Sequence, residues 1–234
     1  MANDGILIIN KPAGWTSHDV VNKTRRLLGG VKAGHTGTLD PFATGILILL
    51  IGRATRQAIR FEHDVKGYTA EVTFGYATDT YDCTGSVTET GDPSQVDTAA
   101  LLAAIEQFRG ESYQVPPPYA AVKVGGVRLY KLARQGKAAV AQPRKITVHS
   151  ITSDIGRFPV VTLEMVCSKG TYVRSIAHEL GKKAGCPAHL SALVRTRVGE
   201  YSLADAVDFL SAVRESDVEL LVRNIRTMQD TEAT

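Results

Sequence analysis

The chain has 234 residues, of which 44% are hydrophobic and 22% charged, and its formal net charge is +3. These values are close to the average for a globular protein, and the length suits one large domain or two small ones. No apolar run approaches the ~20 residues that cross a bilayer, Met1–Asp4 does not resemble a signal peptide, and three scattered cysteines predict neither disulfides nor zinc, so we expect a cytoplasmic protein.

The first part of the chain predicts an alternation of strands and helices. Thr16 and Asp19 have the spacing of a capping box, which starts a helix that Gly29 and Gly30 end. The elements expected here are a buried strand over 6–9, a turn over 11–14, a helix after Thr16, a strand over 46–51 and a helix through Arg53, Arg56 and Arg60.

The rest of the chain continues this mixture. Alternating apolar residues from Tyr68 to Tyr76 indicate a half-buried strand. The other expected elements are a helix over 97–108, a strand over 160–167, a helix over 172–184, a strand over 194–201 and a helical acidic tail over 202–234. Because the order lacks strict βαβ alternation, an α+β fold with a mixed sheet fits better than a doubly wound fold.

The positive charge is concentrated in one segment. No acidic residue lies between Glu111 and Asp154, and this stretch contains Lys123, Arg128, Lys131, Arg134, Lys137, Arg144 and Lys145. We expect residues 113–149, the basic segment, to be an insertion or a mobile arm, a long loop of the kind that often carries function. A local site for a polyanion would explain its charge, and so would a solvated loop kept soluble by lysines.

One carboxylate stands out by its setting. Asp40 lies in a stretch of glycines and threonines, Gly34–Gly45, directly before the apolar strand. The glycines and Pro41 fix the backbone and hold the acid in a rigid, nearly uncharged environment, which suits a catalytic carboxylate. The alternative is an ordinary turn, because Asp-Pro commonly opens one.

Several well-known catalytic motifs are absent from the sequence. It contains no phosphate loop, dinucleotide fingerprint, paired zinc ligands or nucleophile elbow. The six histidines are scattered, and none is three or four positions from another. A kinase, dehydrogenase, metallohydrolase or α/β-hydrolase is therefore disfavoured, and carboxylate chemistry without a metal or redox cofactor remains.

Five blocks of the sequence closely resemble the TruB family of pseudouridine synthases. They are Lys11–Val21, Gly34–Gly45, Gly52–Arg56, Gln114–Lys123 and Cys167–Arg174, in the order found in the family. The resemblance implies one catalytic domain over 1–234, with a mostly antiparallel mixed sheet flanked by helices, a thumb-like insertion at 113–149 and an acidic helical tail at 202–234. It also implies isomerisation of uridine 55 in the T-loop of tRNA, by base flipping. This rearrangement is redox-neutral, so no cofactor or metal is expected.

The resemblance assigns the catalysis to three residues. Asp40 becomes the catalytic carboxylate, although attack on C1′, attack on the base and removal of the C2′ proton all stay open. Arg174 falls in the first turn of a helix, where the helix dipole disfavours a cation and an anion is needed; the resemblance supplies Asp40. The residues alone make Tyr68 a core aromatic, whereas the resemblance makes its ring stack on the flipped uracil.

Other residues are placed around the base by the same resemblance. Tyr172 and Leu193 would line the pocket, and core packing is the alternative for both. His35 would fill the space that the flipped base leaves, and Lys11 would lie beside the pocket. The alternatives are a loop histidine and a turn lysine. Asp82 also matches an acid of the family, without an assigned role.

The expected partner is the elbow of tRNA, bound through its phosphates. The cations expected to make these contacts are Arg53, Arg56, Lys123, Arg128, Lys131 and Arg134. Such contacts position RNA without reading its bases, and they weaken as salt rises. We expect a monomer without membrane contacts.

The end of the chain helps to choose between a stand-alone synthase and its guide-RNA-dependent relatives. Many family members continue into a small RNA-binding domain called PUA, but the chain after Tyr201 is too short and too acidic for a complete one. We expect that this domain was lost or trimmed, which argues against the guide-RNA-dependent relatives. A tRNA-binding folding factor is the other alternative.

Overall fold

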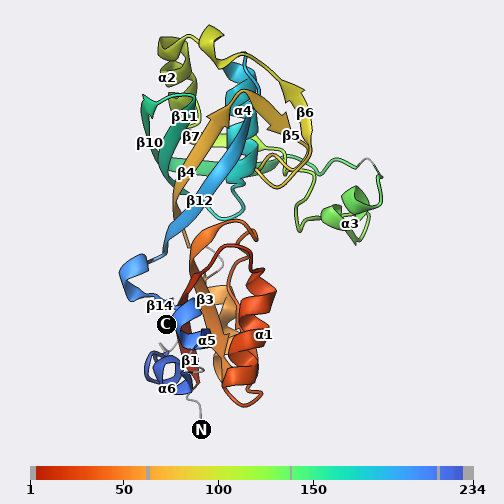
Figure 1. The fold of residues 1–234 in the computed structure, drawn as a ribbon. Coiled ribbons are helices and arrows are strands. Elements are labelled where there is room, and N and C mark those ends of the chain that lie inside the picture. The colour runs from red at the N-terminus through yellow and green to blue at the C-terminus, as the bar shows by residue number, and fades with distance from the viewer. Residues whose placement is uncertain (1–3, 62–63, 138, 215–216, 229–234) are drawn as a thin grey trace. The chain divides into compact units, whose positions relative to one another are not determined.

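The computed structural model describes residues 4–61, 64–137, 139–214 and 217–228 (Figure 1). The chain divides into two compact units: unit 1 comprises Met1–Lys66 and Val194–Thr234, and unit 2 comprises Gly67–Leu193. The single catalytic domain expected over 1–234 stays a prediction, because a compact unit need not fold alone. Each unit is described by itself.

Unit 1 is built on a small sheet that is covered on both faces. Its elements are β1 (Gly5–Lys11), α1 (Ser17–Leu27), β2 (Ala33–His35), β3 (Thr44–Ile51), the 3-10 segment η1 (Gly52–Phe61), the end of β12 (Ala188–Val198), β13 (Tyr201–Ser202), the 3-10 turn η3 (Leu203–Asp205), β14 (Val207–Asp208), α5 (Phe209–Arg214) and α6 (Val218–Arg223). The strand order is β14-β1-β3-β12, and β2 also pairs with β3.

The two central strands are apolar on both faces, which explains their nearly continuous apolar sequence. One face of β1 and β3, which includes Leu7 and Leu49, packs on residues of α1, α5 and α6. The other face, which includes Ile8 and Ile48, packs on Ala54 and Phe61 of η1 and on Val198 of β12. Alternate side chains therefore enter different cores.

One loop of unit 1 connects β2 to β3 and carries Asp40; we call residues 36–43 the Asp40 loop. β3 pairs with β2 through Leu49–Ile51, and with β12 through Thr44 and Gly45. Gly45 has φ of +103°, and a Cβ there would overlap the backbone of its partner Arg195. Glycine at this position therefore lets β12 approach the end of the loop closely.

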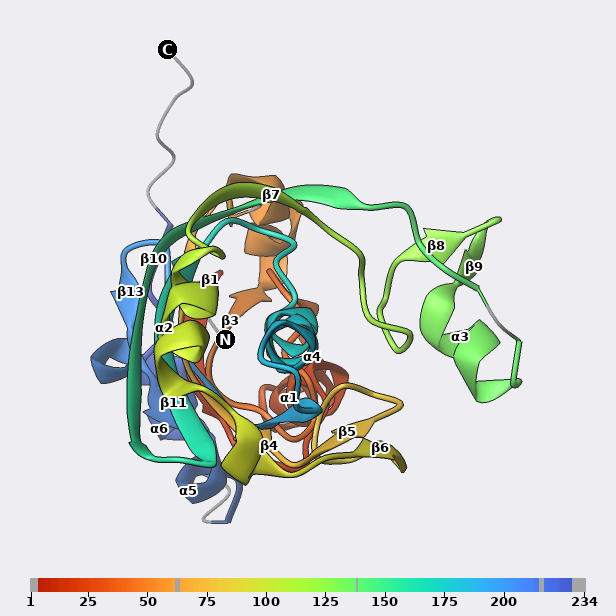
Figure 2. The same cartoon turned by 90° about the horizontal axis from the view of Figure 1, so that it is seen from above.

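Unit 2 is built on a longer sheet. Its elements are β4 (Lys66–Phe74), β5 (Tyr76–Thr78), β6 (Val87–Thr90), the 3-10 turn η2 (Pro93–Gln95), α2 (Thr98–Glu106), β7 (Gly110–Gln114), β8 (Lys123–Val124), β9 (Val127–Arg128), α3 (Leu129–Arg134), β10 (Arg144–Arg157), β11 (Val160–Cys167), α4 (Val173–Lys183) and the start of β12. The strand order is β12-β4-β11-β10-β7. Figure 2 shows β4, β11, β10 and β7 curving around α2 and α4.

The basic segment differs from the loop that the sequence predicted. It contains the hairpin of β8 and β9, the helix α3 and the first residues of β10. Gly125 and Gly126 have φ of +56° and +81°, which builds the tight two-residue turn of the hairpin. The part around α3 protrudes from the sheet of its unit (Figures 1 and 2). Four buried residues form a small core for it: Ala120, Val122, Leu129 and Ala141.

Most of the predicted elements are confirmed, with shifted ends. Thr16 and Asp19 form the predicted capping box, and α2 and α4 occupy the predicted ranges. The segment of Arg53, Arg56 and Arg60 is 3-10 rather than α-helical. The last long strand, predicted over 194–201, instead runs from Ala188 to Val198. The acidic tail, predicted to be helical, contains α5 and α6, but it begins with η3 and with β14, which pairs with β1. Residues 215–216 and 229–234 of this prediction, like Met1–Asn3, lie outside the described residues.

The mixed, mainly antiparallel arrangement confirms the predicted α+β class. In the described part of the chain, no helix is long and apolar enough to cross a membrane.

Candidate active site

The backbone of the Asp40 loop is held at every carbonyl from Gly37 to Pro41. Arg195 donates to the carbonyl oxygens of Gly37 and Thr38, each at 3.2 Å. The Asp40 carbonyl accepts from the amide of Ala43 at 3.2 Å. Since unbonded loop carbonyls leave a chain free to move, this complete bonding confirms a defined turn around Asp40.

Ser17 and Lys11 hold the remaining carbonyls. The Ser17 hydroxyl accepts from the Leu39 amide at 2.8 Å and donates to the Leu39 carbonyl at 3.1 Å. The Pro41 carbonyl accepts from Lys11 Nζ at 3.2 Å and from the Gly14 amide at 2.8 Å. The capped start of α1 and the end of β1 thus fix the two residues that flank Asp40.

Lys11 itself is fully buried at the end of β1. Its ammonium group also donates to the carbonyls of Pro12 and Trp15, at 2.8 and 2.7 Å. Burial lowers the pKa of Lys11 to about 8, and the nearby charge of Asp40 opposes this shift. The ammonium group serves the local backbone, which favours the alternative of a turn lysine over a direct contact with RNA.

Arg195 is a buried cation that the sequence analysis missed. Its residue is 3% exposed, and its Nε donates to the Ile46 carbonyl at 2.7 Å. The signal in the sequence was its position two residues after Leu193 on a predicted strand. Side chains two positions apart on a strand lie on the same face, so Arg195 shares the inward face with Leu193. The signal was weak, because Arg197 continues the same pattern and is exposed.

His35 ends β2 at the entrance of the Asp40 loop. Its Nδ1 is buried and has no hydrogen-bond partner among the described residues. Burial, and then the charges of Arg195 and His18, lower the pKa of His35. The imidazole is therefore held in its neutral form around neutral pH.

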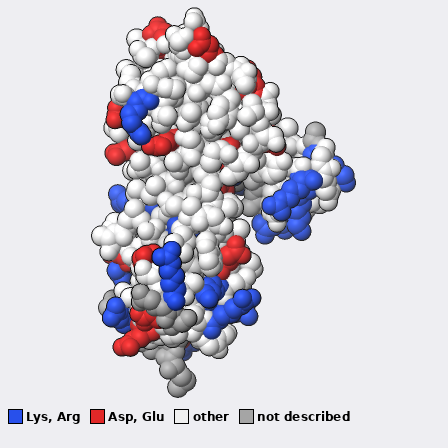
Figure 3. Space-filling model, in the orientation of Figure 1, with Lys and Arg blue, Asp and Glu red and all other residues white. Residues whose placement is uncertain are grey.

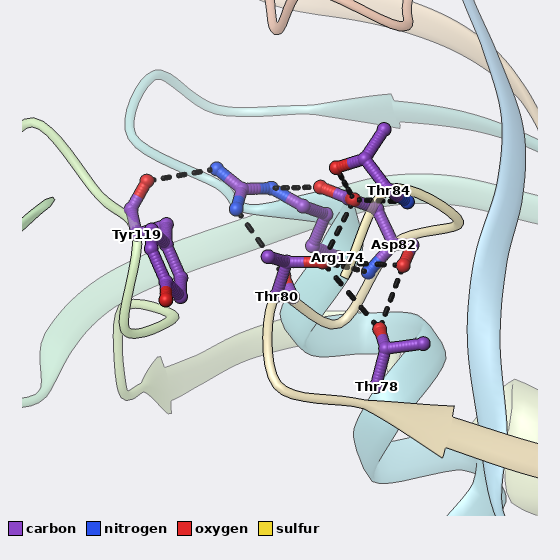
Figure 4. Close-up of polar contacts among 6 residues, drawn as sticks. All are labelled: Thr78, Thr80, Asp82, Thr84, Tyr119 and Arg174. Carbon is purple, nitrogen blue, oxygen red and sulfur yellow. Dashed lines mark hydrogen bonds and ion pairs between the residues drawn. The ribbon is translucent and has the colours of Figure 1, made fainter. Parts of the chain in front are cut away.

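In unit 2, Arg174 lies where the sequence predicted, in the first turn of α4, and is 4% exposed. One anion beside it is Asp82, whose Oδ2 lies 3.7 Å from Nε (Figure 4). Nη1 and Nη2 donate to the carbonyls of Thr80 and Tyr119, both at 3.3 Å. The expected pairing of Arg174 with Asp40 involves the other unit and stays a prediction.

Asp82 is held in turn by a ring of threonines (Figure 4). Its Oδ1 accepts from the hydroxyls of Thr80 and Thr84, at 2.8 and 2.6 Å, and from the Thr84 amide at 3.0 Å. Tyr81, with φ of +65°, stacks on His178 one turn after Arg174 in α4, with ring centroids 3.7 Å apart. This strained turn and its stack fasten the Asp82 loop to the helix that carries Arg174.

The aromatic residues expected at the base belong to the same unit. Tyr68 lies in β4 and is half-buried, while the apolar face that follows it, from Ala70 to Phe74, is buried. Tyr172 is the N-cap of α4, and its backbone exchanges two hydrogen bonds with the Gln114 side chain, at 2.7 and 3.0 Å. Leu193 is 6% exposed in β12. Contact of these three residues with a base stays a prediction.

The cations expected to bind phosphate are exposed. On the basic segment these are Lys123, Arg128, Lys131 and Arg134. Figure 3 shows Lys and Arg gathered on the part of the chain that carries α3 in Figure 1. Arg53 and Arg56 are exposed on η1, where Arg53 pairs with Asp4.

The structure thus brings the predicted residues together in two groups. Asp40 lies in one loop of unit 1 with Lys11 and His35 beside it. In unit 2, Arg174, Tyr172 and Asp82, the acid that had no assigned role, meet at the start of α4. Together with Arg195, the first group combines a carboxylate with two buried cations, which hold the loop that carries it through backbone carbonyls.

Comparison with known proteins identifies the family. The family described as TruB family pseudouridylate synthase (N terminal domain) matches residues 25–173, and a tRNA pseudouridylate synthase B C-terminal domain matches residues 174–228. The chain belongs to the TruB family. This confirms the resemblance carried by the five sequence blocks, and places the chain in a family of isomerases named for their action on tRNA.

Curated relatives agree with this family. A tRNA pseudouridine synthase B from Symbiobacterium thermophilum is 50% identical over 206 residues, which are 87% of this chain and 69% of the relative. The protein of that name from Geotalea uraniireducens is 46% identical, over 87% of this chain and 66% of the relative. The chain therefore spans about two thirds of the length of these two TruB proteins. It covers 90% of the Opitutus terrae protein, at 44% identity.

Among solved structures, the chain is similar to a protein in the crystal structure of a Cbf5-Nop10-Gar1 complex. The TM-score is 0.71 and the identity 27%, with 95% of this chain and 60% of that chain covered. A structure of an H/ACA RNP bound to a substrate RNA matches with a TM-score of 0.69 and 25% identity. These likenesses confirm the pseudouridine synthase fold for the TruB chain.

Proposed function

We propose that this protein isomerises uridine to pseudouridine at position 55 in the T-loop of tRNA, with Asp40 as its catalytic residue. The observation that carries the proposal is the Asp40 loop, in which every carbonyl from Gly37 to Pro41 is hydrogen-bonded. A loop held in this way places one carboxylate reproducibly, which a reaction at a single sugar carbon requires. The tRNA pseudouridine synthase B relatives supply the class of substrate.

The chemistry needs few groups. The N1–C1′ bond of uridine breaks, the uracil turns, a C5–C1′ bond forms, the C5 proton leaves and N1 gains a proton. Asp40 acts beside the sugar, by attack or as a base, and the positive charge of Lys11 helps to keep it ionised. Arg174 orients the carboxylate at the reacting uridine, and Asp82 holds Arg174 in place for this purpose.

Extraction of the base uses further residues. Tyr68 stacks on the flipped uracil, and Tyr172 and Leu193 close the pocket around it. His35, neutral because burial lowers its pKa, enters the T-loop where the base was. A neutral imidazole suits this position because it can stack among bases without importing a buried charge.

The tRNA elbow is held by charge. Lys123, Arg128, Lys131 and Arg134 on the basic segment, together with Arg53 and Arg56, contact phosphates on the outside of the RNA. All six are exposed and can reach a ligand. The protein acts as a monomer.

The decisive experiment compares Asp40→Asn with the unchanged protein on tRNA labelled with tritium at C5 of uridine. We expect release of tritium to stop, while binding of tRNA in a filter assay persists, because asparagine keeps the size of the side chain without its charge. Pseudouridine mapping should show the product at position 55 for the unchanged protein alone. Asp97→Asn, at the N-cap of α2, is the matched control and should retain full activity.

Unchanged tritium release by Asp40→Asn would disprove the role of Asp40, and product at another position would disprove the T-loop assignment. Activity on bare tRNA, without guide RNA or partner proteins, separates this function from a guide-dependent synthase. A tRNA folding factor is the remaining alternative. It predicts that Asp40→Asn still accelerates tRNA folding.

A further inference from the structure

Arg195 has no role in the proposed chemistry, yet it makes as many side-chain hydrogen bonds beside the Asp40 loop as Lys11 does, and two of them hold the loop itself. Its guanidinium group donates from Nε to Ile46, from Nη1 to Thr38 and from Nη2 to Gly37, at 2.7, 3.2 and 3.2 Å. All three acceptors are backbone carbonyls. The planar guanidinium group of an arginine carries its donors on three separate nitrogens, whereas the donors of a lysine all lie on one nitrogen, so a lysine cannot reach the same three carbonyls in the same geometry.

Burial of this charge is costly and needs a reason. Arg195 is 3% exposed, and the ion pairs found among the described residues do not include it. The nearest buried positions of β12 on either side of Arg195, Leu193 and Val198, are apolar. An apolar side chain would fill such a site without the desolvation of a cation. The arginine therefore does something that packing alone does not.

The contacts of the Asp40 loop indicate the role of the Arg195 side chain. Leu39 and Pro41 are held by Ser17, Lys11 and Gly14, and the Thr36 amide donates to the Ile48 carbonyl at 3.1 Å, but these contacts leave the carbonyls between Thr36 and Leu39 unbonded. Arg195 supplies the bonds to these two carbonyls, of Gly37 and Thr38. Its backbone is itself fixed, because Arg195 pairs with Gly45 of β3.

We propose that Arg195 is a positioning residue, which fixes the backbone before Asp40 and thereby aims the carboxylate during the reaction. The proposal rests on the role proposed for Asp40. It predicts that Arg195 supports the reaction through the hydrogen bonds that arrange the loop, and not through its positive charge alone. Loss of the fork would leave the loop formed but free to shift.

The test is Arg195→Lys, which keeps the charge and loses the fork. We expect kcat to fall about 100-fold, as for a misplaced reactive group. The Kd for tRNA should change less than about twofold, because this buried side chain does not face the phosphates. The matched control is Arg197→Lys, two residues along the same strand, where an exposed arginine donates Nε to the Gly199 carbonyl at 2.6 Å. Its kcat should not change.

A second readout does not depend on activity. Hydrogen exchange measured by mass spectrometry should become faster in Arg195→Lys over residues 36–44, and stay unchanged in the rest of unit 1. Exchange in Arg197→Lys should match the unchanged protein.

The outcomes are decisive. An unchanged kcat with unchanged exchange overturns the proposal, and so does faster exchange throughout unit 1 or failure to fold, because each shows a general structural role instead. If the unchanged protein makes no pseudouridine, the proposed function fails. Local exchange over residues 36–44 still decides whether Arg195 holds the loop.

Discussion

The two units each bury cations, and they stabilise the buried charge differently. In unit 1, Lys11 and Arg195 donate to backbone carbonyls, and in unit 2, Arg174 lies beside the carboxylate of Asp82. A carbonyl dipole attracts a cation without cancelling its charge, which is why burial lowers the pKa of Lys11. The comparison teaches that buried cations hold backbone carbonyls in both units, and that unit 2 adds a carboxylate that holds its cationic side chain.

Breaking the pair in unit 2 should have the largest effect. Asp82→Asn removes a carboxylate from beside the buried Arg174, so we expect the free energy of unfolding to fall by about 3–5 kcal/mol. Arg174→Met should also destabilise the protein, and the double variant should lose less than the sum of the two single variants. Urea unfolding of all three variants measures this coupling.

The control for that cycle is an exposed pair in the same unit. Glu111 and Lys145 lie 3.0 Å apart on β7 and β10, and Glu111→Gln should not change unfolding measurably. Strictly additive losses for Asp82 and Arg174 would show that the two side chains do not stabilise each other.

Lys11 provides the corresponding test in unit 1, through pH. Its pKa is about 8 in the folded protein and about 10.4 in an unfolded chain, so the unfolded state binds more protons between these values. The stability contributed by Lys11 therefore rises with pH across this range, by up to about 3 kcal/mol. Urea unfolding from about pH 7 to about pH 10 should show a rise in the unchanged protein relative to Lys11→Met. Parallel curves would show that the ammonium group is not buried.

Exposed cations should behave differently from both buried kinds. Lys131→Met and Arg134→Met, on α3, should each lower the slope of log Kd against log salt by about 1, because each loses about one phosphate contact. At saturating tRNA, kcat should stay unchanged. Lys182→Met, an exposed lysine of α4 paired with Glu179 at 3.3 Å, serves as the control. An unchanged slope for both α3 variants would exclude this helix from the RNA interface.

The smallest effect concerns His35. Burial and the charge of Arg195 lower its pKa, so the unfolded state binds more protons just below pH 6.5. The unchanged protein should therefore lose stability relative to His35→Gln as pH falls below this value. At higher pH, the difference in stability between the two proteins should no longer change with pH. Thermal unfolding across this range tests the prediction, and identical pH dependence in both proteins would contradict it.

Local sequence patterns predicted much of the fold. The capping box of Thr16 and Asp19, the apolar run of β3 and the alternation after Tyr68 all depend on neighbours within a few residues. The hairpin at Gly125 and Gly126 had a local signal too, a glycine pair between short strands, but the loop prediction passed over it. Asp40 was found as a candidate because its turn is local as well.

What the sequence by itself determined was therefore the α+β class, most elements, the family and the turn that carries Asp40. Only the tertiary structure decided which cations are buried and what they hold. Arg195 and Arg197 are two positions apart on one strand, yet one lies under the Asp40 loop and the other is exposed. The physical reason is distance along the chain, because the acceptors of Arg195 at Gly37 and Thr38 come from another segment, as does the Asp82 partner of Arg174. No local pattern encodes such a contact.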